Sequence, residues 1–231
     1  MAILSLIVYG SRAREDHSDS SDTDLFAITD DEKYEMIVKG STNIACYPLK
    51  QAITRARSGD LFFLHITQEA REIYDPQNFF ERIKKDFVRK ESYITEISNA
   101  CELGYALVAS AGRIQDYYLL NKRLAWCLRT ILIARSAEMG CPTFSKEGLA
   151  QLFEDRRISK LISMKDSDNY DSKAYPDFHS IFVRHGIEQN KEMPTEYEDL
   201  INYFLQRNNA MGLKTARLLS HDTEPESYEW G

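Results

Sequence analysis

The sequence contains only four cysteines, and no two of them stand close together. Zinc sites and thioredoxin-type redox sites need cysteines a few residues apart, so neither class is predicted. Widely spaced cysteines in apolar segments are typical of free thiols in a reducing cytoplasm. We therefore expect free, buried thiols at Cys46, Cys101, Cys127 and Cys141.

Positive charge is also scarce, because 29 lysines and arginines face 36 aspartates and glutamates and give a net charge of −7. This balance argues against a protein that binds nucleic acid or an anionic membrane over its whole surface, although a local basic groove is compatible with it. The apolar opening, residues 1–9, has no basic start or cleavage site and is too short to cross a bilayer. We expect a cytoplasmic protein without a membrane partner.

What is present is the composition of a folded protein: 231 residues, 43% of them hydrophobic. That length favours one large or two small domains. Apolar runs at 2–9, 24–29 and 42–47 predict three strands of a small sheet. The segment 49–70 has a helical pattern with a break near 58–59.

The second half of the chain has helical periodicity throughout. Gly140 and Pro142 are typical of the residues that follow a helix, and Thr195 with Glu198 forms a capping box at the start of another. The predicted helices cover 92–111, 113–139, 145–164, 177–189 and 195–219. A domain boundary is expected between 76 and 92 and is drawn at 80, which gives domains 1–80 and 81–220 and a flexible acidic tail, 221–231.

The chemically informative segment runs from Gly10 to Asp24. A glycine directly after a buried strand lets the backbone approach a bulky anion, and Ser11 adds a hydroxyl. Asp22 and Asp24 are two residues apart at the start of a strand, so their carboxylates share one face, with Cα atoms roughly 6.5–7 Å apart. Such a pair can bind one or two magnesium ions together with substrate phosphates. This pattern predicts transfer chemistry on a nucleoside triphosphate.

Two simpler interpretations of that segment compete with this one. An acidic, serine-rich stretch is by itself typical of a solvated turn. A calcium loop of the EF-hand kind is excluded, because no glycine follows Asp24 and no glutamate closes a twelve-residue loop. The order of strand, Gly-Ser, ten residues, Asp-x-Asp and strand favours a functional site.

Gly10-Ser11, the ten-residue spacing and Asp22-Thr23-Asp24, with Arg12-Ala13-Arg14 after the glycine-serine pair, resemble the polymerase-beta-type nucleotidyltransferases, especially the minimal nucleotidyltransferases of toxin–antitoxin pairs. The resemblance covers about the first 75 residues, and the helical half is similar in style to kanamycin-type nucleotidyltransferases. It implies an α+β fold, a small mixed sheet followed by a helical bundle that binds the acceptor or a partner.

The resemblance also implies roles for individual residues. Gly10 and Ser11 would hold the triphosphate, and Asp22 and Asp24 would hold magnesium. Arg12 and Arg14 would help to bind phosphate, or else they are surface cations that offset the nearby acidic residues. The active site is expected between the two domains.

The third carboxylate of the family is absent, because the best match on the next strand is Asn43. An amide oxygen can coordinate magnesium but has no charge and cannot act as a general base. Asp30 and Asp31 are expected to start a helix instead of replacing it.

Two main functions stay open. The first is magnesium-dependent transfer of a nucleoside monophosphate, with ATP as the first choice of donor, to a hydroxyl of a protein, a tRNA or a small molecule, as an antitoxin or defence component. The second is nucleotide binding or partner neutralisation without turnover. A weaker third is an RNA-binding module that uses Lys84 and Lys85.

Three further residues of the first half of the chain are interpreted as structural. His65 is expected to be a partly buried histidine with its hydrogen bonds satisfied. Glu69 and Glu72 are expected to be solvated.

Overall fold

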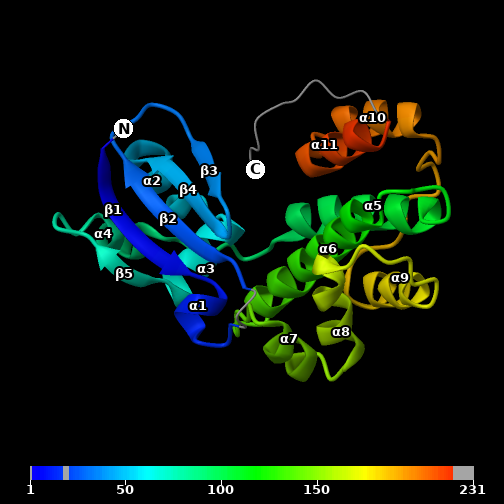
Figure 1. Ribbon diagram of the computed structural model, residues 1–231, viewed down its shortest axis with the longest axis horizontal. Helices are drawn as coiled ribbons and strands as arrows, with labels where there is room; N and C mark the ends of the chain where they lie inside the picture. The colour runs from blue at the N-terminus through cyan, green and yellow to red at the C-terminus, as the bar shows by residue number, and fades with distance from the viewer. Residues whose placement is uncertain (1, 18–20, 221–231) are drawn as a thin grey trace. The chain divides into compact units, whose positions relative to one another are not determined.

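The computed structural model describes residues 2–17 and 21–220, and the chain divides after Glu91 into two compact units (Figure 1). The expected α+β class is confirmed, because a five-stranded mixed sheet is followed by a helical region. The domain boundary predicted from the sequence lies at residue 80, within an expected interval of 76–92. The tail 221–231 lies outside the described residues. Within the described ranges, no helix is long and apolar enough to cross a bilayer.

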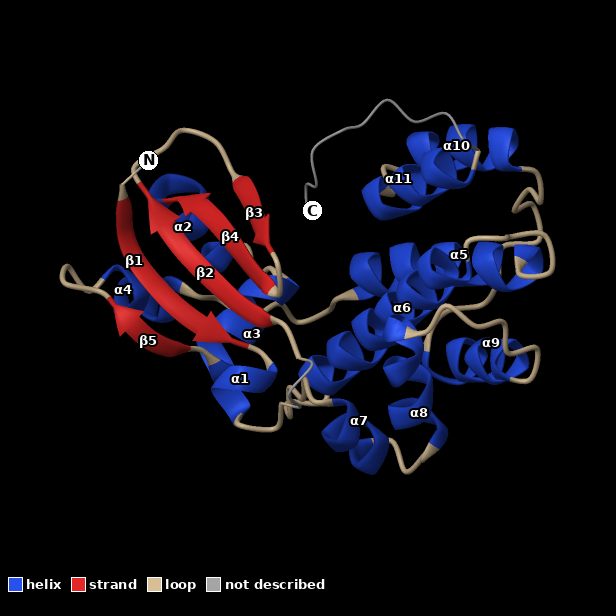
Figure 2. Cartoon of the chain, in the orientation of Figure 1, coloured by secondary structure: helices blue, strands red, loops and turns tan. Residues whose placement is uncertain are grey.

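The first unit is built on one sheet with the strand order β3-β4-β2-β1-β5 (Figure 2). Strands β2 and β4 are parallel, and the other neighbours are antiparallel. The three predicted strands are present as β1, β2 and β4, whereas β3 and β5 were not predicted. The bounds are β1 Ile3–Tyr9, β2 Thr23–Thr29, β3 Glu35–Lys39, β4 Thr42–Pro48 and β5 Arg71–Tyr74.

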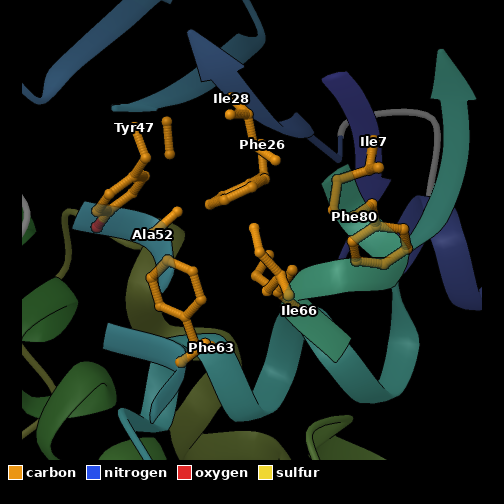
Figure 3. Close-up of a cluster of buried hydrophobic side chains, with 11 residues drawn as sticks. Ile7, Phe26, Ile28, Tyr47, Ala52, Phe63, Ile66 and Phe80 are labelled. Carbon is orange, nitrogen blue, oxygen red and sulfur yellow. The ribbon is translucent and has the colours of Figure 1, made fainter. Parts of the chain in front are cut away.

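Three of the four helices of this unit, all except α1, cover one face of the sheet and close its core. Alternate residues of the central strands, such as Ile7, Phe26 and Ile28, pack against apolar residues of the helices (Figure 3). The helical break predicted near 58–59 is confirmed, because Gly59 with φ 68° separates two helices. The helices of the unit are α1 Ser11–Arg14, α2 Leu49–Arg57, α3 Leu61–Glu69 and α4 Phe79–Asp86.

The second unit is helical, and its two longest helices, α5 and α6, match the predicted ones closely. The helix predicted over 177–189 begins earlier, because proline is tolerated in a first helical turn and Pro176 stands there. The described elements are α5 Ile94–Ser110, α6 Tyr117–Glu138, α7 Lys146–Leu152, α8 Arg157–Ser163, the short 3₁₀ helix Met164–Asp166, α9 Ala174–His185, α10 Tyr197–Gln206 and α11 Ala210–Leu219.

Two predicted helices are each broken in the structure. The prediction over 145–164 becomes α7 and α8, and Glu154 between them has φ 52°. The prediction over 195–219 becomes α10 and α11, and Asn208 between them has φ 55°. Left-handed residues of this kind end a helix, but they leave the apolar spacing on both sides unchanged.

Three local predictions were wrong. Thr195 does not cap a helix, because α10 begins two residues later, after Glu196, without a side-chain cap. Asp30 does not start a helix either: it follows β2 directly, and its Oδ1 accepts a hydrogen bond of 2.6 Å from the Ala2 amide. Asp31 likewise lies in the connection between β2 and β3. Cys141 is exposed just after α6, whereas the other three cysteines are buried free thiols as expected.

Candidate functional site

Three residues form a row across neighbouring strands of the sheet. Tyr9 of β1 pairs with Asp24 of β2, and Asp24 pairs with Asn43 of β4. Two residues further into the sheet, Phe26 pairs with both Ile7 and Ala45, which are core residues. Because side chains alternate along a strand, the row lies on the helix-covered face, just beyond the core.

Asn43 is bonded directly to Asp24. Its Nδ2 donates a hydrogen bond of 3.1 Å to Asp24 Oδ1, so the amide adds no negative charge and fixes one oxygen of the carboxylate. The sequence placed Asn43 beside the Asp22–Asp24 pair on the next strand, and the register agrees with that placement. The hydrogen bond leaves Asp24 Oδ2, the remaining oxygen, and the second lone pair of Oδ1 for a metal at this position.

Gly10 faces that remaining oxygen. A Cβ added at Gly10 would lie 3.4 Å from Asp24 Oδ2, an ordinary van der Waals contact, so a side chain at this position would occupy the space beside the carboxylate. The backbone of Gly10 has φ 72° and ψ −149°, a conformation that residues with a side chain rarely adopt. Ser11 and Arg12 open helix α1, where the first amides have no carbonyl one turn earlier to bind. The Gly10 bend thus lies beside Asp24 and leads directly into these amides.

Asp22 is exposed and lies one residue before β2. The start of that strand is fixed by the Thr23 amide, which donates a hydrogen bond of 2.7 Å to the Ser41 carbonyl. Two carboxylates fit a magnesium ion that is also held by substrate phosphates and water. Within residues 2–17 and 21–220, no three carboxylate, histidine or cysteine side chains gather closely enough to hold a metal ion by themselves.

The two arginines after the bend are held differently. Arg12 Nη2 donates a hydrogen bond of 2.8 Å to the Ser21 carbonyl, and its Nε is buried with no hydrogen-bond partner in the described part of the chain. Arg14 is bound to Asp16 at 2.9 Å and to Glu69 at 2.5 Å. Burial lowers the pKa of Arg14, but these acidic partners outweigh it and leave the pKa raised. Arg14 therefore fits the structural alternative, whereas Arg12 is bound through one nitrogen to the backbone of Ser21.

The prediction for Glu69 was wrong, because this side chain is only 16% exposed and accepts from two partners. His65 Nε2 lies 2.8 Å from Glu69 Oε2, one helical turn away, which confirms the interpretation of His65 as a satisfied histidine. Glu72 is exposed, as expected. Arg14, Glu69 and His65 thus form a chain of contacts that joins α1 to α3.

This chain of contacts reaches the row on the sheet. The His65 ring lies edge-on to the Tyr9 ring, with 5.5 Å between their centroids, and Tyr9 is the strand partner of Asp24. Sequence reasoning missed the connection because Arg14 and Glu69 are 55 positions apart. The four-residue spacing of His65 and Glu69 on one helix was the only local signal.

Lys84 is one of the two lysines that an RNA-binding role would use. Its Nζ donates to Glu81 Oε1 at 2.9 Å and lies 4.2 Å from the centre of the Phe80 ring. Both contacts are on the same short helix, α4. Such contacts within one helix are typical of a solvated helix face.

Comparison with known proteins gives little help. No family model and no curated protein matches the chain. Among solved structures, the chain is similar to a nucleotidyltransferase-like protein from Exiguobacterium sibiricum, with 13% identity and a TM-score of 0.27, over 96% of this chain and 75% of the other. A likeness this distant leaves the function to be argued from the site itself.

Proposed function

We propose that the first unit binds a nucleoside triphosphate with magnesium and transfers its nucleoside monophosphate to an acceptor hydroxyl. The observation that carries the proposal is the Gly10 bend, whose backbone faces the free oxygen of Asp24. The ten residues between Ser11 and Asp22, with the Asp-x-Asp spacing, add sequence support. ATP is the first choice of donor, and the acceptor hydroxyl belongs to a protein, a tRNA or a small molecule.

In this proposal the bend supplies the phosphate cradle. Gly10 lets the β- and γ-phosphates approach the backbone, and the amides of Ser11 and Arg12 with the Ser11 hydroxyl donate to their oxygens. Arg12, whose guanidinium is bound to the Ser21 carbonyl through Nη2, would add positive charge beside the phosphates. Held this way, the triphosphate presents its α-phosphorus beside Asp24.

Asp22 and Asp24 would hold the magnesium, which supplies charge neutralisation for the phosphates when it is bound. The hydrogen bond from Asn43 fixes Asp24 in one orientation. In the reaction, the acceptor oxygen forms a bond to the α-phosphorus, the bond from that phosphorus to the bridging oxygen breaks, and pyrophosphate leaves. The hydroxyl proton passes to a base or to solvent.

A second candidate is nucleotide binding without turnover, as in a protein that neutralises a partner. The contact that favours it is the one between Asn43 and Asp24, since an amide stands where a third carboxylate would complete the metal site. The site then holds less negative charge, which lowers its affinity for divalent metal. An antitoxin or defence role is compatible with either candidate.

The test is incubation with ATP, GTP, CTP and UTP labelled at the α-phosphate, with magnesium and with tRNA, an aminoglycoside or the protein itself as acceptor. Label transfer and pyrophosphate release are measured. We expect Asp24→Asn to lower the rate about a hundredfold or more. Glu72→Gln removes an exposed carboxylate of the same unit and is expected to leave the rate within about twofold.

Transfer by the wild type separates the two candidates, and Asn43→Asp measures what the amide costs in magnesium affinity. If the protein binds without turnover, nucleotide raises the melting temperature of the wild type, no transfer is measured, and the aspartate variant gains magnesium affinity. If the protein is a transferase, the wild type already transfers label. Absence of both thermal protection and transfer with every nucleotide would contradict both candidates.

A further inference from the structure

Strand β3 forms one edge of the sheet in the first unit, and among the described strands only β4 lies beside it (Figure 2). Its sequence is Glu35-Met36-Ile37-Val38-Lys39, with a negative charge at one end and a positive charge at the other. Both charged side chains are exposed, and neither forms an ion pair within the described part of the chain. Val38 is exposed as well, to 56%. The outer edge of β3 therefore offers charged and apolar groups to another strand.

The register of the hairpin shows which main-chain groups of β3 point away from the sheet. Lys39 pairs with Thr42 across a two-residue turn, and the residues that flank such a turn are joined by a hydrogen bond. Because the direction of bonding alternates along an antiparallel strand, Lys39 and every second residue before it bond to β4. The amides and carbonyls of Met36 and Val38 therefore point away from β4.

A second copy of β3 fits these groups when the two strands run antiparallel about a two-fold axis at Ile37. Met36 of one copy then lies opposite Val38 of the other, and the two residues exchange both of their main-chain hydrogen bonds. In the same register Glu35 lies opposite Lys39 of the second copy, and opposite charges in this arrangement stabilise a strand pair. We propose that β3 pairs with β3 of a second copy in this register, so that one sheet continues through a dimer.

The two charges favour this arrangement over the alternatives. In a parallel pair in register, each charge would lie opposite a charge of the same sign, which is destabilising. A shift of the antiparallel register by two residues, in either direction, would place Glu35 or Lys39 opposite Ile37. Only the register centred on Ile37 pairs both charges.

The apolar side chains of β3 are compatible with the same register. Met36 pairs with the core residue Ala45 and packs against the core. Val38 lies on the same face as Met36, because side chains two residues apart share a face. The exposed Val38 would therefore contact Met36 of the second copy, and Ile37 on the other face would contact its own symmetry mate. Burial of these side chains supplies the apolar part of the association.

The opposite edge of the sheet lacks this symmetry. In β5 the charged residues Arg71 and Glu72 are adjacent, so their side chains lie on opposite faces. Directly opposed residues of an antiparallel pair share a face, so no two-fold register of β5 brings Arg71 opposite Glu72. Glu72 is therefore a matched control position for a change of charge at a sheet edge.

The proposed dimer does not depend on the nucleotide chemistry, and the full chain tests it. Sedimentation velocity at low ionic strength follows the average mass as the protein concentration rises to about 0.5 mM. We expect a monomer–dimer equilibrium with a dissociation constant below about 0.3 mM, a weak value because one short strand from each copy makes a small interface. Hydrogen exchange at the amides of Met36 and Val38 is expected to slow over the same range.

Charge exchange locates the contact. Glu35→Lys places lysine opposite lysine and Lys39→Glu places glutamate opposite glutamate, so we expect each variant to weaken its own dimer about tenfold or more. An equimolar mixture of the two variants restores opposite charges, and we expect it to form a heterodimer with about the affinity of the wild type. Glu72→Lys makes the same charge change on β5 and is expected to leave the dissociation constant within about twofold.

Val38→Pro is an independent probe, because it removes an outward amide and leaves the bonds to β4 in place. We expect it to weaken the dimer, and circular dichroism checks that each variant is folded. Should a charge variant fail to fold, the comparison of Val38→Pro with the wild type still decides. A wild type that stays monomeric at every concentration, a dimer that these variants leave intact, or a mixture of the two charge variants that does not associate would overturn the assignment.

Discussion

Gly10 has a backbone conformation that a side chain would strain. Its φ of 72° and ψ of −149° lie in a region almost restricted to glycine, so Gly10→Ala is expected to lower the free energy of unfolding by about 1–3 kcal/mol. Gly40 also has a positive φ, of 59°, but no atom of the described residues lies within 4 Å of an added Cβ.

Gly40→Ala is the matched control, and denaturant unfolding measures both variants. We expect a smaller loss for Gly40→Ala, because an ordinary left-handed residue is strained less than the Gly10 conformation. A smaller loss at Gly10 than at Gly40 would refute the strain argument. If the triphosphate binds at the bend, Gly10→Ala also removes the stabilisation by nucleotide, while Gly40→Ala keeps it.

The position of a site residue can be predicted from the sequence where the residue lies in a regular helix or strand, because the spacing of that element fixes its neighbours. Asp24 and Asn43 were predictable because strand spacing fixes which side chains share a face. The ion pair between Arg14 and Glu69 was not, since it joins residues far apart and surface charges leave no periodic signal. The burial of Glu102 beside Arg207 was equally hidden, because it follows from packing around α5.

At the scale of elements, helix α3 depends on its cap. The carboxylate of Asp60 accepts hydrogen bonds from the amides of Phe62 at 2.9 Å and Phe63 at 3.2 Å, and it is paired with Arg55 at 2.7 Å. Asp60→Ala is expected to lower the free energy of unfolding by about 1–2 kcal/mol. Asp60→Asn keeps a capping oxygen and is expected to lose less than half of that amount.

The control for this cap is Asp86→Ala, which removes an ion pair to Arg57, a side chain 61% exposed. Such a pair contributes about 1 kcal/mol at most. Chemical denaturation followed by circular dichroism compares the three variants. Equal losses for Asp60→Ala and Asp86→Ala would show that the cap is not what stabilises α3.

Elements were predictable where they bury a regular apolar pattern. Strands β1, β2 and β4 and the long helices α5 and α6 have such patterns. Strand β5 was missed because all four of its residues are exposed, and β3 was missed because it begins and ends with a charged residue. The two broken helices were predicted as continuous because one left-handed residue does not disturb the spacing around it.

At the scale of the whole molecule, the first unit has a complete core of its own. That core runs from Ile7 to Ile83 and includes the buried face of α4. We expect a fragment of residues 2–91 to fold with a single cooperative thermal transition. A fragment of residues 2–80 lacks Ile83 and most of α4, and we expect it to melt at a lower temperature or not to fold.

Circular dichroism and proton–nitrogen NMR spectra of the two fragments are the measurement. Dispersed amide signals are expected only for the longer one. If both fragments melt at the same temperature, helix α4 contributes nothing to the first unit. That result would favour the boundary at residue 80.

Strand β5 closes one side of the sheet and has a consequence for solubility. A border strand offers its outer amides and carbonyls to any other extended chain, which is a route to polymerisation. Here the border is only four residues long, and two of them, Arg71 and Glu72, are charged. Arg71 is also tied to Glu15 at 2.5 Å. Because this edge is short and half of its residues are charged, a strand of a second molecule is not expected to add to the sheet beside β5.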